Sequence, residues 1–341
     1  MLLGDLSNAF GPSGYEKEVR AILRGAIEGH VDRLWVDSLG NLHAEKRGCG
    51  DNRLRVLLTA HMDEVGLMVV GHDDSGALRV RAIGGLDPRI FPATAVWVGA
   101  ERIPGVVGLK PIHLLEAGER DRVVPVKEMV VDIGAGGKDE AQKLAPAGTT
   151  AVFATRFQEL GPTVLGKAFD DRAGCAVLAE LLQGERFTHD LHAVFTVQEE
   201  VGLRGAVVAG YAADPDCAFV LEGTIADDLP RRKDVSPTSE LGKGPVITVM
   251  DRSFIAHRGL LRLMEETAQA LGIPRQFKQP GIGGTDAGAI HRARGGVPSA
   301  AVAVPCRYIH SPVSLLSRDD FEHTVRLMRG TLERLTRTAL S

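Results

Sequence analysis

An interruption in the alternation of strand and helix patterns constrains the fold of this chain more than any other feature. The apolar run "LRVLLTA" (54–60) is typical of a buried strand, and "RAGCAVLAELLQG" (172–184) is typical of a helix. Between about residues 69 and 160, short strand-like runs are separated by Gly, Pro and Asp, and helical periodicity is almost absent. We therefore expect an α/β domain, a mixed sheet flanked by helices, formed by 1–68 and 161–341, with a small β-barrel inserted at 69–160.

Composition and charge exclude several classes of protein. The 341 residues are 44% apolar, which is enough for a sizeable core. The formal net charge is -4 with both signs mixed, so no basic surface for nucleic acid or membrane lipid is indicated. No apolar run approaches the roughly 20 residues of a membrane helix, and the N-terminus does not resemble a signal peptide. Cys49, Cys175, Cys217 and Cys306 are scattered, as is typical of reduced thiols in a cytosolic protein.

Two short motifs predict the starts of helices. Ser13 and Glu16 form an S-x-x-E pattern, which predicts a capping box and a helix over about 15–27. In "GGTDAGAI", the two glycines permit a tight turn, and Asp286 is placed to cap the helix that follows. Thr285 in the same motif is a candidate for contact with a substrate.

Acidic and imidazole side chains gather where the predicted strands end. His61 and Asp63 follow the strand at 54–60, and Glu199 and Glu200 follow the apolar run "LHAVFTV". Asp170 and Asp171 come just before a predicted helix, Glu222 ends the strand-like run "CAFVLEG", and His310 follows the strand-like run "VPSAAVAVP". In an open α/β sheet the carboxyl ends of the strands line the ligand crevice, so we expect these side chains to lie close together.

Each of these residues alone has an ordinary explanation, such as a helix cap, a solvated turn or a hydrogen-bonded loop histidine. Together they favour a metal site. Histidines and carboxylates without thiols suit Zn²⁺, Co²⁺ or Mn²⁺ better than Ca²⁺ or Mg²⁺. Two divalent cations would offset the repulsion among the buried acids. One of the two adjacent glutamates would then be free to take a proton from an attacking water.

At these residues the chain resembles the dinuclear metallo-aminopeptidases of peptidase family forty-two, the TET or glutamyl/deblocking aminopeptidases. The resemblance extends in the order of the family from Ser13 to Pro312, and it implies a phosphorylase/hydrolase-like fold of the zinc-peptidase type. The motifs that carry it are "SGYE", "DSLGNL", "AHMDEVG", "GKAFDDRAG", "VQEEVGLRGA", "LGKGPVI", "GGTDAGAI" and "RYIHSP".

The resemblance also implies a role for each residue. The expected metal ligands are His61, Asp170, Glu200, Glu222 and His310. Asp170 would bridge the two ions, Glu199 would be the general base, and Asp63 would orient His61. Many members of the family carry Asp where this chain has Glu222, which has the same carboxylate on a longer stem. The exact position of the first metal therefore depends on this substitution.

Two further residues have open interpretations. His113, in "KPIHLL", lies in the predicted insertion, where a role in a loop or in a subunit contact is at least as good an explanation as catalysis. Arg231, in "RRKD", is expected to be solvated, with a role in a substrate pocket as the alternative.

The sequence thus predicts a cytoplasmic metallo-aminopeptidase that hydrolyses N-terminal residues from peptides with two divalent ions, Zn²⁺ or Co²⁺ or alternatively Mn²⁺. The resemblance implies that the insertion at 69–160 mediates dimerisation. It further implies that the dimers form a hollow homo-oligomer, a dodecamer, which admits short or unfolded peptides.

Other functions remain open at this stage. A related metal-dependent carboxypeptidase would need a cation for the free carboxylate of its substrate, and Arg172 and Arg307 are the arginines near the proposed ligands. A deacylase would use the same metal chemistry. An endoglucanase would need two carboxylates free of metal. An inactive scaffold would be indicated by a missing ligand or base, and the sequence lacks none of them.

Overall fold

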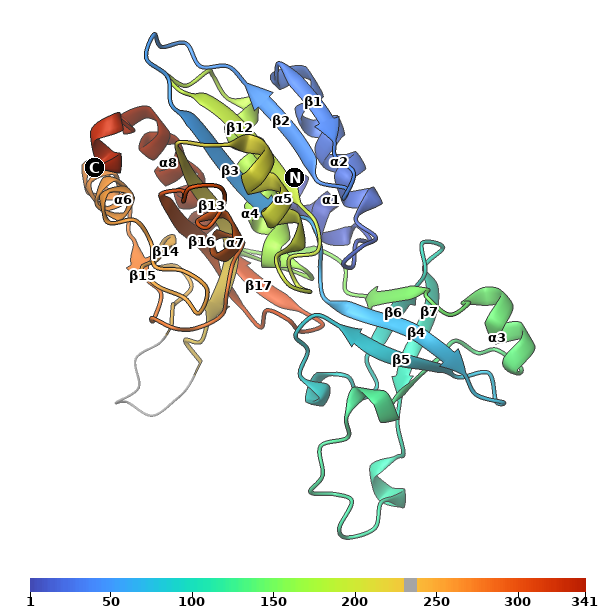
Figure 1. Cartoon of the computed structure of the whole chain (residues 1–341). Coiled ribbons are helices and arrows are strands. Elements are labelled where there is room, and N and C mark those ends of the chain that lie inside the picture. Colours follow the sequence, from blue (N-terminus) through green and yellow to red (C-terminus); the bar gives the residue numbers. More distant parts are fainter. Residues whose placement is uncertain (230–237) are drawn as a thin grey trace.

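The computed structural model describes residues 1–229 and 238–341 (Figure 1). A large mixed sheet carries helices on both faces, and a closed barrel of β-strands lies beside it. The predicted fold class, an α/β domain with an inserted small β-barrel, is confirmed. Within the described part of the chain, no helix is both long and apolar enough to cross a membrane. The cysteines are free, and all but Cys49 are buried.

Parallel pairing in the middle of the large sheet positions the site. Strands β12, β3, β13 and β16 run parallel to one another, so their carboxyl ends meet at one edge. In order across the sheet, the strands are β1 (Arg33–Val36), β2 (Leu42–Lys46), β12 (Asp190–Thr196), β3 (Arg55–His61), β13 (Cys217–Ala226), β16 (Ser299–Arg307), β17 (Ser314–Ser317), β11 (Thr163–Gly166) and β10 (Gln158–Leu160). Strand β14 (Val246–Thr248) lies off this order and pairs with both β15 (Gln276–Phe277) and β16.

Both faces of this sheet are covered, which explains the continuous apolar run in β3. Val56 and Leu58 pack into the core beneath one layer of helices, whereas Leu57 packs into the core on the opposite face. The first layer contains α1 (Leu2–Asn8), α2 (Lys17–Ile27), α4 (Phe169–Gln183), α6 (Arg258–Ala270) and α8 (Arg318–Arg334). The opposite face carries α5 (Arg204–Ala213) and α7 (Ala287–Ile290).

The barrel closes in the order β4-β5-β8-β7-β6-β9 around its own apolar core, which includes Val69, Val80 and Val131. Its elements are β4 (Gly66–His72), β5 (Leu78–Ile83), β6 (Ala95–Val98), β7 (Ile103–Gly108), β8 (Val130–Asp132), α3 (Lys138–Leu144) and β9 (Thr150–Phe153). A long arm between β7 and β8 projects away from the rest of the protein (Figure 1). Short 3-10 turns are η1 (Glu28–His30), η2 (Pro88–Ile90), η3 (Ile112–Leu114), η4 (Val126–Glu128) and η5 (Arg337–Leu340).

The predicted helix caps are wrong, although both helices are present. Helix α2 begins at Lys17, but neither Ser13 nor Glu16 makes the hydrogen bonds of a capping box. Asp286 stands at the N-cap of α7 without capping it, and instead accepts a hydrogen bond from Thr196 Oγ1 over 2.5 Å. Ser13 and Asp286 instead bond to side chains from distant parts of the chain, Asp63 and Thr196. Glu16 accepts the backbone N–H of Gly14 over 2.6 Å.

Candidate active site

The predicted site residues meet at the edge of the sheet where the parallel strands end. Their side chains come from β3 (His61), the loop after β12 (Glu199 and Glu200), β13 (Glu222), the start of α4 (Asp170) and the loop after β16 (His310). Since these elements are adjacent in space but distant in sequence, the site depends on the whole sheet being formed.

Asp170 lies between the two histidines. Its Oδ1 is 3.1 Å from His61 Nε2, and its Oδ2 is 3.3 Å from His310 Nε2. Glu222 Oε2 approaches the same nitrogen of His61 at 3.7 Å, while Glu200 Oε1 is 3.1 Å from His310 Nε2. The site is therefore two groups of possible ligands that share one carboxylate.

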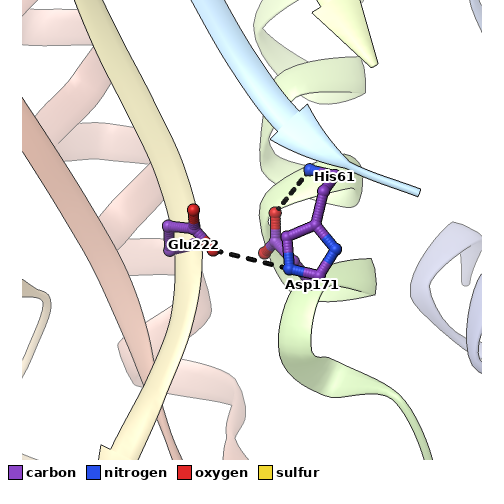
Figure 2. A group of neighbouring side chains, drawn as sticks. All are labelled: His61, Asp171 and Glu222. Atoms are coloured by element: carbon purple, nitrogen blue, oxygen red, sulfur yellow. Dashed lines mark hydrogen bonds and ion pairs between the residues drawn. The ribbon is translucent and has the colours of Figure 1, made fainter. Parts of the chain in front are cut away.

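Asp171 is a neighbour of this site that we did not predict as a ligand. It comes within reach of His61 and Glu222, and the three could form a metal-binding group (Figure 2). However, Asp171 Oδ2 accepts the backbone N–H of His61 over 3.0 Å, and its Oδ1 accepts that of Gly174 over 2.8 Å. Because both oxygens are already engaged, we assign Asp171 to holding the end of β3. The peptide bond between Asp170 and Asp171 is cis.

The electrostatics of the cluster fit a site for cations. Burial raises the pKa of Glu199 and of Glu222, which also lie among other acids. Burial opposes a charge on His310, but Asp170 and Glu200 outweigh it and raise its pKa to about 11. Glu222 Oε1 is buried and has no hydrogen-bond partner in the described part of the chain. Buried acids need protons or cations, and this donor set suits divalent metal ions.

Asp63 braces the site from behind and is fully buried. Its Oδ1 accepts the backbone N–H of Glu199 over 3.0 Å. Its Oδ2 accepts the backbone N–H of Glu200 over 3.2 Å and the hydroxyl of Ser13 over 2.6 Å. Asp63 Oδ1 also lies 3.4 Å from His61 Nδ1, and the backbone oxygen of Asp63 is 3.1 Å from the same nitrogen. One residue thus contacts both the imidazole and the loop of the two glutamates.

Two more residues that sequence reasoning missed hold this loop. The Glu16 carboxylate accepts the backbone N–H of Gln198 over 3.3 Å. Asn41 Oδ1 accepts the backbone N–H of Val197 over 3.0 Å, and its amide donates to Gly205 O over 3.1 Å. The motifs "SGYE" and "DSLGNL" contain both residues, so the resemblance marked the right segments without giving their role.

Comparison with known proteins decides the family. The family model described as M42 glutamyl aminopeptidase matches residues 40–327. The chain belongs to this family. The prediction of a metal-dependent peptide hydrolase of the aminopeptidase class is confirmed, and divalent metal ions are implied for this M42 chain.

Relatives of this M42 chain match it over almost its full length. The lysyl aminopeptidase of Pyrococcus furiosus is 34% identical over 333 residues, or 95% of this chain and 94% of that protein. The TET aminopeptidase of Thaumarchaeota archaeon SCGC AB-539-E09 is 37% identical with a TM-score of 0.94, covering 99% and 98% of the two chains. The TET1 peptidase of Pyrococcus horikoshii, which can assemble into a tetrahedron or a large octahedral shell, is 36% identical with a TM-score of 0.85, covering 98% and 99%.

A pocket of about 580 Å³ opens onto the acidic cluster of the M42 chain, and its wall includes Thr285, Lys278 and Tyr308. The predicted substrate contact Thr285 lines this pocket, with its hydroxyl donating to Asp251 Oδ2 over 3.2 Å. A larger groove, about 920 Å³, runs between α2 and the barrel. We assign the site to the smaller pocket because the ligand-type residues line it.

The remaining candidates lie elsewhere. Arg172 is fully buried, and donates to backbone carbonyls and to Glu64. Arg307 pairs with Asp228 at 2.6 Å. Both arginines are therefore engaged and point to no carboxylate-binding subsite. His113 lies exposed on the arm of the barrel, and Arg231 falls outside the described residues.

Proposed function

We propose that the chain removes N-terminal residues from short or unfolded peptides, with two metal ions at the shared cluster and Glu199 as the general base. The observation that carries the proposal is the position of Asp170, which directs one carboxylate oxygen toward His61 and the other toward His310. A carboxylate placed in this way can bridge two cations.

The residues would divide between the two ions as the resemblance implies. His61, Asp170 and Glu222 would hold the first, and Asp170, Glu200 and His310 the second. Once bound, the ions would supply Lewis acidity, which lowers the pKa of a water molecule and polarises the scissile carbonyl. Zn²⁺ or Co²⁺ fits this set of imidazole and carboxylate ligands, with Mn²⁺ as the alternative.

Glu199 is the residue that we assign to moving the proton. Its Oε2 lies 3.9 Å from His61 Nε2, beside the cluster but farther away than Asp170. Asp63 holds its backbone in place, as described above. Glu199 would take a proton from the attacking water and deliver it to the leaving amine. The raised pKa that burial gives this carboxylate makes it a stronger base and so favours the first step.

The site also supports an aminopeptidase over a carboxypeptidase. Several carboxylates surround the pocket, and such groups can receive the cationic α-amino group of a peptide. The arginines that a carboxypeptidase might have used, Arg172 and Arg307, are already paired. We keep Thr285 as a substrate contact, because it lines the same pocket.

Assembly is part of this proposal. The arm of the barrel exposes Ile112 by 71%, Leu114 by 62% and Val123 by 52%, an apolar surface suited to contact with a second copy. We propose that the barrel mediates dimerisation and that the dimers close into a dodecamer in the cytoplasm. Tetrahedral rotational symmetry relates twelve equivalent positions, and the P. horikoshii TET1 peptidase can form a tetrahedron. Light scattering coupled to size exclusion tests the assembly, and a monomer would contradict it.

Three versions of one short peptide test the reaction: free, N-acetylated and C-amidated. The protein is first stripped of metal and then reloaded with Zn²⁺, Co²⁺ or Mn²⁺. Acetylation removes the charge and donors of the amine, so we expect it to slow cleavage strongly, whereas amidation should have little effect. Loss of cleavage on amidation alone would overturn the aminopeptidase proposal in favour of a carboxypeptidase.

A further inference from the structure

Asp251 is a buried carboxylate that joins two loops beside the active-site pocket. It follows β14, and only 5% of the residue is exposed. Its Oδ1 accepts the backbone N–H groups of Ser253 over 2.6 Å and of Phe254 over 3.0 Å, and the hydroxyl of Ser253 over 2.7 Å. Its Oδ2 accepts the hydroxyl of Thr285 over 3.2 Å. Asp251 stands outside the candidate metal cluster, so this set of hydrogen bonds needs another explanation.

The two loops are also joined through their backbones. The N–H of Arg252 donates to Gly283 O over 3.0 Å. Gly288 lies so close to the side chain of Ser253 that no room is left for a β-carbon. Thr285 stands between these two contacts in sequence and is only 5% exposed. Its side chain is therefore held in one place by the loop of Asp251.

The bond to Asp251 fixes the direction of the Thr285 hydroxyl. An ionised carboxylate only accepts hydrogen bonds, so Thr285 must donate its one hydrogen to Asp251. The lone pairs of the Thr285 oxygen are then all that this hydroxyl can offer to a ligand. Since Thr285 lines the pocket of about 580 Å³, it provides a neutral hydrogen-bond acceptor at the pocket wall.

Thr285 belongs to the side of the pocket that carries the proposed base. The next residue, Asp286, accepts the hydroxyl of Thr196 at the end of β12 over 2.5 Å, and the loop after β12 carries Glu199. Thr285 and Glu199 both line the pocket. Because Glu199 would deliver a proton to the leaving nitrogen, that nitrogen must come close to this side. Its N–H needs an acceptor once the substrate excludes water from the pocket.

We propose that Thr285 accepts the N–H of the scissile peptide bond, and that Asp251 is the positioning residue that keeps the Thr285 oxygen available for it. This inference rests on the proposed function and deepens it. The α-ammonium group of the substrate is charged and is matched by the carboxylates of the pocket, whereas a neutral hydroxyl oxygen suits a neutral peptide N–H. The site would therefore distinguish an amide from an ester, which has an oxygen in place of this N–H.

Leucine p-nitroanilide and leucine p-nitrophenyl ester test the contact, with metal-reloaded protein and with spontaneous ester hydrolysis subtracted. The two substrates share their acyl and aryl groups and differ at the scissile bond. T285V keeps the shape and removes the oxygen, so it should lower kcat/KM for the anilide by about 10-fold relative to the ester, which is typical for a buried N–H without an acceptor. T285S keeps a hydroxyl and should retain most of the wild-type anilide-to-ester ratio.

D251N tests the positioning role. The Asn oxygen can still accept from Ser253 and Phe254, but the amide nitrogen faces Thr285 and donates to it. The Thr285 hydrogen then turns toward the pocket, so D251N should also lower the anilide-to-ester ratio by about 10-fold. D251N/T285V should lose no more than T285V, because Asp251 acts through Thr285. T267V, at a buried threonine of α6 outside the pocket, is the matched control and should keep the wild-type ratio.

Binding of the phosphonate analogue of leucine, measured by calorimetry, adds a readout without turnover. This compound keeps the α-ammonium group and has no scissile N–H, so T285V should bind it with the wild-type Kd. Weaker binding by T285V would overturn the inference, because Thr285 would then contact the α-ammonium group. Thermal unfolding and metal content verify that each variant is folded and loaded.

The remaining outcomes separate this inference from the proposed function. Equal losses on the anilide and the ester in T285V, or a wild-type ratio in T285V or D251N, overturn the inference while the aminopeptidase function stands. If the reloaded wild type cleaves neither these substrates nor short peptides, the proposed function fails, and this inference fails with it.

Discussion

The backbone N–H of Glu199 donates to Asp63 Oδ1 over 3.0 Å, so the residue behind His61 also fixes the loop that carries the proposed base. Asp63 has no exposed surface, and its other oxygen accepts the N–H of Glu200 and the hydroxyl of Ser13. A single carboxylate therefore couples the orientation of a proposed ligand to the position of the base.

We expect D63N to impair the site without unfolding the protein. Asn has the same shape, but its amide nitrogen cannot accept the N–H of Glu199 or Glu200. Loss of a hydrogen bond that supports a metal ligand typically lowers metal affinity or activity by about 10- to 100-fold. We expect D63N to lower kcat by a factor of this size. S13A removes only one donor to Asp63 and should have a smaller effect. Wild-type kcat and metal content in D63N would contradict this role.

Glu199 should be needed for turnover but not for metal binding. E199Q keeps the shape and removes the base, so kcat should fall by at least about 100-fold, as is usual for general bases. Metal content, measured on the purified protein, should stay at the wild-type level. E333Q, on the exposed surface of α8, is the matched control and should retain full activity. Near-normal turnover of fully loaded E199Q would show that another group accepts the proton.

A buried cluster beneath the site should contribute strongly to stability. Glu64 is 2.7 Å from Lys167 Nζ and 3.1 Å from Arg172 Nη2, and all three residues are buried. E64A leaves two cations without their anion, so we expect it to lower the free energy of unfolding by about 3–5 kcal/mol.

The matched control for E64A is E28A, which removes an exposed ion pair with Arg24 on α2. Exposed pairs of this kind contribute about 0.5 kcal/mol or less, so E28A should unfold like the wild type. Denaturant unfolding of both variants makes the comparison. Equal losses in the two variants would show that the buried cluster is no more important than a surface pair.

The gathering of ligands was predictable from sequence because it follows from topology. Strand ends meet in a parallel sheet, so His61 and Glu222 could be placed together from their position after apolar runs. The hydrogen bonds that hold the site residues in place could not be predicted in this way. Ser13 and Glu16 match a local capping pattern, but two of their partners, Asp63 and Gln198, lie far away in sequence. A pattern within a few residues carries no information on such contacts.

Asp171 illustrates the same limit. Asp170 and Asp171 are adjacent and chemically identical, and only the backbone donors around Asp171 separate their roles.

A hydrogen-bonded chain of Asp37, His43 and His192 near one edge of the large sheet should make stability depend on pH. His43 Nε2 is 3.1 Å from Asp37 Oδ2, and His43 Nδ1 is 3.0 Å from His192 Nε2. Since Asp37 accepts, His43 donates to it and accepts from His192, which leaves the His43 ring neutral. Burial, with His43 and Arg33 nearby, lowers the pKa of His192 to about 4.

This lowered pKa fixes the sign of the effect. Above the unfolded value of about 6.5, neither state of His192 is charged; below it, the unfolded chain takes up a proton that the folded chain refuses until about pH 4. Stability is therefore lost as the pH falls through this window. Between pH 7.5 and 5, the wild type should lose about 2 kcal/mol more than H192Q, which keeps a donor for His43. H30Q, at an exposed histidine, should behave like the wild type in denaturant unfolding at both pH values. An identical loss in H192Q and the wild type would show that His192 is not the group that titrates.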